Sequence, residues 1–453
     1  MSKQDSLSCN VSRCIDSFFI VNLGCSKNQV DAEKIISVLI GGGYKYSLNP
    51  DKADLIILNT CAFIEPAREE SVDLALSLRA VYPDKKIILS GCLSERYRNK
   101  LGSLLPEINA FFGNRDPGKI IEIVKSLEKE DNISLYPVSG NAEHVRNEFL
   151  SLPGSVYIKI SEGCSNNCTY CSIPLIRGSH RSRKIDDIIN EVTSYIKKGF
   201  FEIVLIAQDL ASYNMKNGFS GLPKLLKRIL AIDGDFWLRL LYIHPDNFPE
   251  EIIKLCAEDK RILPYFDIPF QHASSKILHA MGRSGNQEEY LQLIDRIRSK
   301  LPASVIRSTF MVGFPGEREK EFQELLSFQK KADIDWAGFF SYSREEGTAA
   351  YGLRGRENFR VPAKKILVRK QLLETAQTVI TQNRLKKFIG KKMQVLVEEE
   401  VKNEDMVLAR GYFQAPEVDG LIVVKGAASS LPGERLNVEI TGCNGIDLEA
   451  VVL

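Results

Sequence analysis

The first third of the chain alternates short apolar runs with amphipathic stretches. Three runs are nearly continuous in isoleucine, leucine and valine, a pattern typical of parallel strands that are buried on both faces. A stretch with helical periodicity follows each run, so we expect an open parallel α/β sheet in this region. The predicted strands lie at 18–24, 54–60 and 86–91, and the predicted helices at about 29–40, 65–80 and 94–101.

A second and longer alternation begins near residue 155. It contains six strand-helix units in succession, which favours a partial barrel of six parallel strands, a partial (β/α)6 barrel. In such barrels the chemistry takes place at the carboxyl ends of the strands. The predicted strands lie at 156–160, 202–206, 236–240, 265–268, 305–312 and 336–342, and the helices near 185–198, 221–231, 248–257, 274–281, 286–299 and 317–331.

The last part of the chain changes character. A long helix is predicted over 362–388, and short strands with turns follow at 393–398, 406–411, 420–425, 436–441 and 447–453. Strands of this length favour a small antiparallel β-barrel. We therefore divide the α/β chain into a polar leader, a first sheet domain, a partial barrel and a terminal β-barrel, with bounds at 1–16, 17–140, 150–385 and 386–453.

The bulk composition excludes several classes of protein. The chain has 453 residues, 44% of them hydrophobic, and a net charge of only +2, so no overall basic field points to nucleic acid. No apolar run approaches the ~20 residues that span a bilayer, and the polar leader lacks a signal-peptide segment. We expect a cytoplasmic enzyme with no membrane partner. Its ten cysteines would face a reducing cytosol, which favours ligand thiolates over disulfides.

Three of these cysteines, Cys164, Cys168 and Cys171, lie within eight residues just after the first strand of the predicted barrel. Three thiolates so close together can hold three irons of a 4Fe-4S cluster and leave the fourth iron open for a substrate. Clusters that only carry electrons normally take four cysteines. The alternative is a zinc site, but structural zinc needs four ligands, and the nearest further candidate, His180, lies in a basic loop.

Cys25, Cys61 and Cys92 are far apart in sequence, but each follows one of the three predicted strands of the first domain. Parallel strands end along one edge of their sheet, which is where open α/β sheets bind ligands. The three thiols are therefore candidates for a second cluster. The alternative of three ordinary core cysteines stays open, because spacing alone does not show that they meet. No function is assigned to the remaining cysteines, Cys9, Cys14, Cys256 and Cys443.

Polar residues also follow the other strands of the predicted barrel. Singly each is a weak signal, since polar residues at strand ends often only cap or turn the chain. Together they outline one ligand-binding edge, where glycines would let the backbone approach a ligand. They are Gln208 and Asp209 after the second strand, His244 after the third, Gln271 and His272 after the fourth, and the turn 313–317 after the fifth.

The predicted terminal barrel is acidic. Residues 390–453 contain six Lys or Arg and eleven Asp or Glu, which gives a net charge of −5. A barrel that binds RNA through phosphates should be basic, so nucleic-acid binding is not expected to dominate. The acidic charge instead favours a basic partner, unless it marks only a solvated face.

The cysteine spacing and its surroundings resemble the radical S-adenosylmethionine (SAM) methylthiotransferase family. The run from Cys164 to Cys171 is followed by Ser-Ile-Pro and by a basic segment at 177–183, as in that family. The three spaced cysteines and a terminal barrel similar to a TRAM domain complete its three-domain plan over almost the whole chain. The segments at 22–31, 59–64, 267–272 and 415–420 resemble most strongly its RimO type, which modifies an aspartate of a small-subunit ribosomal protein.

The resemblance implies two 4Fe-4S clusters. The cluster on the closely spaced cysteines would bind SAM and generate a radical, which makes Cys164, Cys168 and Cys171 the catalytic set. The cluster on Cys25, Cys61 and Cys92 would supply sulfur. The residues expected to bind SAM are Tyr170, Gln208, Asp209, Gln271, Arg307, Gly313 and Gly316.

The reaction that the resemblance implies adds a methylthio group to the β-carbon of an aspartate in ribosomal protein S twelve, free or in the small subunit. That partner is very basic, which suits an acidic barrel. An electron donor such as flavodoxin or ferredoxin is also expected. Two alternatives stay open: a transfer RNA methylthiotransferase of the MiaB type, which would gain from a basic barrel, and a non-enzymatic iron-sulfur carrier, which needs no six-loop barrel edge.

Overall fold

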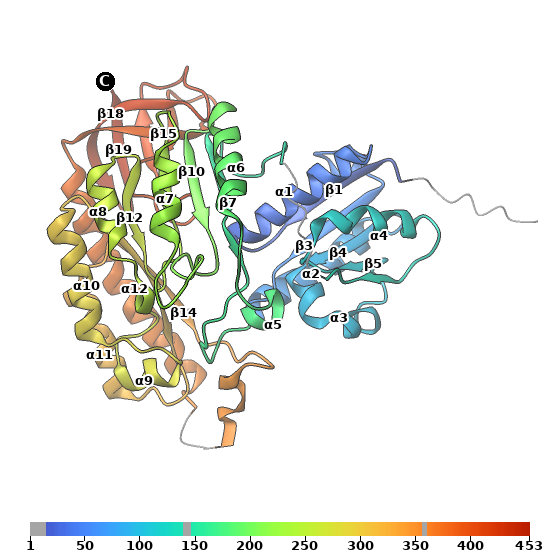
Figure 1. The fold of residues 1–453 in the computed structure, drawn as a ribbon, viewed down its shortest axis with the longest axis horizontal. Helices are drawn as coiled ribbons and strands as arrows, with labels where there is room; N and C mark the ends of the chain where they lie inside the picture. The colour runs from blue at the N-terminus through green and yellow to red at the C-terminus, as the bar shows by residue number, and fades with distance from the viewer. Residues whose placement is uncertain (1–14, 139–145, 356–359) are drawn as a thin grey trace, which may run out of the picture. The chain divides into compact units, whose positions relative to one another are not determined.

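A computed structural model describes residues 15–138, 146–355 and 360–453. The chain forms two compact units, which divide after Leu150 (Figure 1). Most of the predicted leader, including Cys9 and Cys14, lies outside the described residues. No helix within the described ranges is both long enough and apolar enough to cross a bilayer.

The first unit contains a six-stranded parallel sheet in the order β2-β1-β3-β4-β5-β6. Every residue of β3 is buried, which explains why its apolar run shows no alternation. The predicted open parallel sheet is confirmed, with further short strands at its edges. The strands are β1 (Ser17–Asn22), β2 (Lys45–Tyr46), β3 (Leu55–Thr60), β4 (Lys86–Gly91), β5 (Ala110–Phe112) and β6 (Ile133–Leu135).

Helices connect the strands of this first sheet. The apolar side of α1, with Ile36 and Leu39, packs in one core with Ile123 and Leu127 of α4. Two of the helices begin at a predicted ligand: Cys25 is the N-cap of α1, and Cys92 is the first residue of α3. The helices are α1 (Ser26–Gly41), α2 (Glu65–Val81), α3 (Cys92–Leu104) and α4 (Ile120–Leu127), with 3-10 turns η1 (Pro50–Lys52) and η2 (Pro117–Lys119).

The second unit contains a six-stranded parallel sheet in the order β14-β13-β12-β11-β10-β7. These strands follow one another in chain order and do not close, because β7 and β14 are both edges. The predicted partial barrel is confirmed. The strands are β7 (Ser155–Lys159), β10 (Glu202–Ile206), β11 (Trp237–Leu240), β12 (Ile262–Asp267), β13 (Val305–Val312) and β14 (Trp336–Ser341); a small ribbon pairs β8 (Ser161–Glu162) with β9 (Arg181–Ser182).

Figure 1 shows the helices of the second unit along the outside of this sheet. The long last helix buries every fourth residue from Arg369 through Leu373 and Gln377 to Leu385, the stripe expected of a helix that packs along one face. The helices are α5 (Ile173–Arg177), α6 (Ile185–Lys197), α7 (Leu222–Leu230), α8 (Glu251–Glu258), α9 (Ser275–Ala280), α10 (Gln287–Lys300), α11 (Glu319–Ala332) and α12 (Ala363–Leu385), with 3-10 turns η3 (Pro245–Asn247), η4 (Ala349–Gly355) and η6 (Lys386–Phe388).

The last strands close into a barrel in the order β15-β16-β17-β19-β18. The predicted small antiparallel barrel is confirmed: four of its five strand pairs are antiparallel, and β17 and β19 pair in parallel. A closed barrel with an odd number of strands cannot alternate direction all the way round, so one parallel pair is required. The strands are β15 (Lys392–Glu400), β16 (Met406–Arg410), β17 (Ile422–Lys425), β18 (Arg435–Asn444) and β19 (Asp447–Val452).

This β-barrel packs against the amino ends of the parallel strands. The fully buried Arg410 of β16 donates hydrogen bonds to Glu202 at the start of β10 (2.6 Å) and to Ser155 at the start of β7 (3.0 Å). Trp336 Nε1, at the start of β14, donates to the Phe413 carbonyl (2.8 Å). The barrel therefore covers one end of the sheet and leaves the carboxyl ends of the strands for ligands.

The packing also changes how the acidic charge of the barrel is understood. Glu398 is buried and accepts a hydrogen bond from Arg410 (2.6 Å). The side chain of Asp419 is only 1% exposed and lies 3.4 Å from Arg307. Glu398 is thus paired within the barrel and Asp419 joins the barrel to the sheet, so only the exposed acidic residues can meet a partner.

Candidate active site

Cys164, Cys168 and Cys171 lie in the loop between β8 and α5, at the carboxyl edge of the sheet. Gly163 opens the loop with φ +74°, and a Cβ atom there would lie 2.3 Å from the Ser179 carbonyl oxygen, so only glycine fits. The Thr169 backbone donates to the Met281 carbonyl (2.9 Å). The loop is thus held by backbone contacts, and all three cysteines are partly exposed.

Asp209, which follows β10, holds the loop of the three cysteines against the end of the sheet. Its carboxylate accepts hydrogen bonds from Asn166 in the loop (3.0 Å) and from Ser212 (2.5 Å) on one oxygen. The other oxygen accepts from the backbone of Ala211 (2.9 Å) and of His244 (3.1 Å). A carboxylate has about four acceptor sites, so these contacts fill them. The geometry gives Asp209 a positioning role, and its expected contact with SAM stays a prediction.

A second group of charges fixes the start of the loop. Glu162, directly before Gly163, accepts hydrogen bonds from Arg177 (2.9 Å) and Gln208 (3.0 Å) and contacts Lys159. Burial by itself would raise the pKa of Glu162, but the two cations outweigh it and hold that pKa well below its usual range. Gln208 Oε1 has no hydrogen-bond partner among the described residues, so it is available to a ligand.

The chemistry of the three thiols fits an iron-sulfur cluster better than a zinc ion. No three Cys, His, Asp or Glu side chains in the described part of the chain converge on a single metal ion. Zinc requires such convergence, whereas each thiolate of a cluster binds its own iron. Burial raises the pKa of Cys164 to about 11 and of Cys171 to about 12, so the positive charge of bound iron is needed to hold them as thiolates. His180, the candidate fourth zinc ligand, hydrogen-bonds Ser182 instead (2.9 Å).

Cys25, Cys61 and Cys92 come together at one edge of the first sheet. They follow β1, β3 and β4, which are neighbours in that sheet. Gly24 has φ +95°, and a Cβ atom there would lie 3.0 Å from Cys61 Cβ, so the turn before Cys25 touches Cys61. This arrangement favours a common site over three unrelated core cysteines.

Asn28, in the first turn of α1, connects all three of these cysteine turns. Its Nδ2 donates to the Leu23 carbonyl (3.1 Å) and to the Thr60 carbonyl (2.8 Å), next to Cys25 and Cys61. Its Oδ1 accepts from Cys92 Sγ (3.3 Å). Asn28 was not predicted from the sequence, although it lies inside the segment 22–31. The sequence signal that could have identified it is a side-chain amide three residues after Cys25, the cysteine that follows a strand.

The turn after β13 is shaped by one buried carboxylate. Glu317 accepts a hydrogen bond from the Gly313 backbone (2.8 Å) and pairs with Arg369 of α12 (2.5 Å). Gly313 has φ +80°, and its Cβ position is filled by Ile366, 2.5 Å away. Packing therefore accounts for Gly313, whereas Gly316, with φ +94°, keeps the expected role of letting the backbone approach a ligand.

Gln271 has an uncommon backbone conformation for a residue other than glycine, with φ +69°. Its backbone bridges to β13, donating to the Thr309 carbonyl (2.8 Å) and accepting from Met311 (2.7 Å). The conformation is therefore fixed by the sheet itself. This places Gln271 at the carboxyl edge, where its contact with SAM is expected.

Tyr170 and Arg307 lie in contrasting surroundings. Tyr170 is 9% exposed and packs with Met281 and Phe314 in an apolar cluster that also touches Cys168 and Cys171, which fits a shielding role. Arg307, the third residue of β13, lies 3.5 Å from Asp267 and 3.4 Å from Asp419. These pairs explain Arg307 within the fold, and its contact with SAM stays a prediction.

His244 and Arg283 are further polar residues beside the cluster loop. Burial, reinforced by the nearby Arg283 charge, lowers the pKa of His244 to about 4, so the imidazole is neutral at physiological pH. Arg283 is buried and donates to the Pro269 carbonyl (2.6 Å). The sequence analysis missed Arg283, because an arginine after a short helix carries no distinctive signal.

Asp209→Asn is expected to weaken the cluster loop, because an amide has only one acceptor oxygen, and its NH2 group would face either Asn166 and Ser212 or the backbone N–H groups of Ala211 and His244. We expect about tenfold slower SAM cleavage and less iron retained, from the loss of charge-assisted hydrogen bonds. Iron analysis and single-turnover assays measure both effects. Ser212→Ala removes one of the four bonds and is the matched control. Equal effects of the two variants would contradict the anchoring role.

Comparison with protein families gives three matches along the chain. Residues 17–113 match the uncharacterized protein family UPF0004, and residues 158–328 match the radical SAM superfamily. Residues 389–453 match the TRAM domain. The radical SAM match implies a 4Fe-4S cluster and SAM in this part of the chain.

Curated relatives are similar over nearly their whole length. A protein of Treponema denticola is 43% identical, covering 95% of this chain and 99% of its own. Proteins of Carboxydothermus hydrogenoformans and Thermotoga maritima are each 39% identical, covering 95% of this chain and 98% of their own. All three are named ribosomal protein uS12 methylthiotransferase RimO.

Solved structures show the same fold at low identity. The radical SAM methyltransferase TsrM from Kitasatospora setae is 14% identical, with a TM-score of 0.55 over 74% of this chain and 77% of its own. The cobalamin-dependent radical SAM enzyme OxsB, also 14% identical, gives 0.51 over 80% of this chain and 56% of its own.

Fold, cysteine sets and domain matches together define a radical SAM methylthiotransferase with a TRAM domain. Within that class, the names of the curated relatives indicate which family this chain belongs to. The chain belongs to the RimO family, the ribosomal protein uS12 methylthiotransferases.

Proposed function

We propose that this protein adds a methylthio group to the β-carbon of an aspartate in ribosomal protein uS12. The supporting observation is the pair of three-cysteine sets, each at the carboxyl edge of its own parallel sheet, in a chain similar to RimO relatives over 95% of its length. A carrier protein would need only one such set. The similarity to uS12-modifying relatives and the acidic barrel favour a protein substrate over transfer RNA.

Each cysteine set would hold one 4Fe-4S cluster. When bound, the two clusters and SAM would supply two things: a carbon-centred radical, which removes a hydrogen atom from the substrate, and the sulfur for the new bond. Cys164, Cys168 and Cys171 would leave one iron open for SAM, and Cys25, Cys61 and Cys92 would leave one open for sulfur. Gln208, Gln271 and the turn to Gly316 are the proposed neighbours of SAM, and Tyr170 excludes water.

The chain's own residues then keep the site rigid. Asp209 fastens the cluster loop to the end of β10, and Glu317 fastens the turn after β13 to α12, so the bound groups keep one geometry. The neutral His244 adds no positive charge near Arg283. Reduction requires an outside electron, for which a flavodoxin or ferredoxin is the proposed donor.

The exposed acidic residues of the barrel are proposed to attract the basic substrate. Glu399, Glu400 and Glu404 lie exposed on the β15–β16 hairpin. Reversing all three to lysine is expected to raise the Kd for uS12 about tenfold at low salt and much less at high salt, because such attraction is screened. Titration calorimetry at two ionic strengths measures the effect.

A matched control for this charge reversal replaces Glu107, Glu258 and Glu374, which are exposed on other parts of the chain. It changes the net charge equally and should leave the salt dependence of binding near that of the unchanged protein. If both triple variants bind uS12 alike, the barrel does not select the partner by its local charge.

The proposed activity itself is tested by mass spectrometry. Purified uS12, incubated with the reconstituted enzyme, SAM, a sulfide source and a reductant, should gain the mass of one methylthio group on an aspartate. Nucleosides of transfer RNA from the same incubation should stay unmodified. Modified nucleosides with unmodified uS12 would instead support the MiaB-type activity.

A further inference from the structure

Arg283 is a buried cation, three residues after α9 and beside the loop of the three cysteines. Its guanidinium donates to the Pro269 carbonyl (2.6 Å) and lies within hydrogen-bonding reach of the hydroxyls of Tyr170 and Tyr290. All three of these partners are uncharged. Among the described residues, no carboxylate forms an ion pair with Arg283. A charge that is buried among neutral groups costs free energy unless an opposite charge lies close to it.

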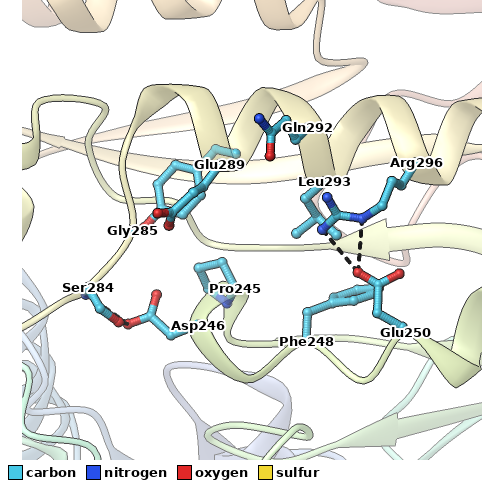
Figure 2. A pocket seen from close by; sticks show the side chains of 11 residues that line it. Pro245, Asp246, Phe248, Glu250, Ser284, Gly285, Glu289, Gln292, Leu293 and Arg296 are labelled. Atoms are coloured by element: carbon cyan, nitrogen blue, oxygen red, sulfur yellow. Dashed lines mark hydrogen bonds and ion pairs between the residues drawn. The ribbon is translucent and has the colours of Figure 1, made fainter.

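Asp246, in the loop after β11, acts on Arg283 but does not pair with it. Its carboxylate accepts two hydrogen bonds from Ser284, from the backbone (3.0 Å) and from the hydroxyl (2.8 Å), and Figure 2 shows the two side chains next to each other. Asp246 also lines a pocket of about 310 Å³ between the loop after β11 and α10, whereas Arg283 does not. The opposite charge that Arg283 requires must therefore come from its other side, where the cysteines lie.

The residues before Arg283 fix it against the cysteine loop. Gly282 has φ +75° and packs on this loop so closely that a Cβ atom there would lie 3.6 Å from Cys168 Cα and 2.4 Å from the preceding carbonyl oxygen. The Thr169 hydroxyl donates to the Ala280 carbonyl (2.8 Å). The segment that carries Arg283 and the loop that carries the cysteines are thus held together through their backbones.

The charge of Arg283 acts on all three cysteines of this loop. Burial raises the pKa of Cys164 and of Cys171, and the nearby Arg283 charge opposes the rise at both. Burial also disfavours the charge on Arg283 itself, but Tyr170 and Cys168 outweigh that effect, so the pKa of Arg283 is raised and the side chain stays charged. One fixed positive charge therefore lies among the three predicted iron ligands.

A 4Fe-4S cluster on three thiolates has a net negative charge, and its reduction adds one electron without forming or breaking a bond. A fixed positive charge nearby stabilises the reduced form more than the oxidised form, and so raises the reduction potential. We propose that Arg283 compensates the negative charge of the cluster on Cys164, Cys168 and Cys171 and makes its reduction by the outside one-electron donor easier. The proposal rests on the proposed function, which assigns this cluster and a donor of the flavodoxin or ferredoxin class.

Arg283→Gln is the test variant, because glutamine can still donate to the Pro269 carbonyl but carries no charge. In the reconstituted holoenzyme, the cluster whose EPR signal responds to SAM is titrated at a series of fixed solution potentials. We expect about tenfold less reduced relative to oxidised cluster at a given potential, the size expected for one lost unit charge, or a midpoint about 59 mV more negative. Arg283→Lys keeps the charge and should stay near the unchanged enzyme.

Arg296→Gln is the matched control for Arg283→Gln, because it removes the same charge from the surface of α10. Figure 2 shows the Arg296 guanidinium facing Glu250, with a nitrogen-oxygen distance of 3.0 Å, and both side chains are about half exposed. Water screens an exposed charge, so this control should change the ratio of reduced to oxidised cluster less than about twofold. The iron content of every variant is measured alongside.

The possible results separate charge from packing. An unchanged midpoint in Arg283→Gln, or equal shifts in Arg283→Gln and Arg283→Lys, would overturn the charge proposal. Loss of iron from Arg283→Gln alone would support it, because charge is then needed to hold the thiolates, whereas loss from both variants would overturn it. Absence of any cluster that responds to SAM in the unchanged holoenzyme would overturn the proposed function instead.

Discussion

Alanine at Cys164, Cys168 and Cys171 is expected to abolish SAM cleavage, whereas alanine at the first cysteine set should leave cleavage intact. The physical reason is that each cysteine set lies at the carboxyl edge of a different parallel sheet. Only the loop after β7 and β8 lies among the strand-end groups expected to hold SAM. The variant lacking Cys25, Cys61 and Cys92 should lose about half of its iron, because each set holds one of two equal clusters. It should also lose methylthio transfer to uS12.

The measurement combines iron and sulfide analysis with chromatography of 5'-deoxyadenosine. Cys256→Ala and Cys443→Ala are matched controls, since Cys256 lies buried in α8 and Cys443 lies in β18, and neither directly follows a strand of a parallel sheet. Both controls should retain all iron and full cleavage. Persistent cleavage after loss of Cys164, Cys168 and Cys171 would refute the assignment of the radical-generating cluster.

Arg410→Met is expected to destabilise the second unit by about 3 to 5 kcal/mol, the cost of leaving buried carboxylates without their cation. Arg410 is fully buried and lies 2.6 Å from both Glu202 and Glu398. Methionine replaces the apolar stem of the side chain but supplies no charge. Denaturant unfolding followed by tryptophan fluorescence reports this loss, because both tryptophans lie in strands of this unit.

Arg435→Met is the matched control for Arg410→Met. Arg435 also joins the β-barrel to the partial barrel, through an ion pair with Asp235, but both side chains are substantially exposed. Exposed pairs contribute about 0 to 1 kcal/mol, so a much smaller loss is expected. Adding Glu202→Gln and Glu398→Gln to Arg410→Met should recover part of the stability. Equal losses for Arg410→Met and Arg435→Met would contradict the burial argument.

The fold was largely predictable because parallel strands buried on both faces leave continuous apolar runs in the sequence. The runs before Cys25, Cys61 and Cys92 gave three neighbouring strands of the first sheet, and the six-unit repeat gave the partial barrel. Shorter elements were missed. Strands such as β2 (Lys45–Tyr46) are held by a neighbouring strand, so their own residues carry little pattern.

The candidate site was predictable only where a residue type is rare and its spacing is chemically demanding. Cysteines meet both conditions, whereas Asn28 and Arg283 do not. Asp209 shows the opposite limit. Its place after a strand was clear, but two of its four hydrogen bonds come from other segments, from Asn166 and His244. Hydrogen bonds with residues that are distant in sequence leave no local pattern in the chain.

The sequence by itself determined the two cysteine sets, the two parallel sheets, the terminal barrel and the family, because these depend on local apolar periodicity and on ligand spacing. Only the tertiary structure decided which charged side chains are buried and paired inside the fold. Glu398 and Asp419 count as acidic in composition but are buried against Arg410 and Arg307. It also brought Asp246, Glu289 and Tyr290 together in one pocket between the loop after β11 and α10. Burial and pairing arise from contacts between distant segments, and those contacts exist only once the chain has folded.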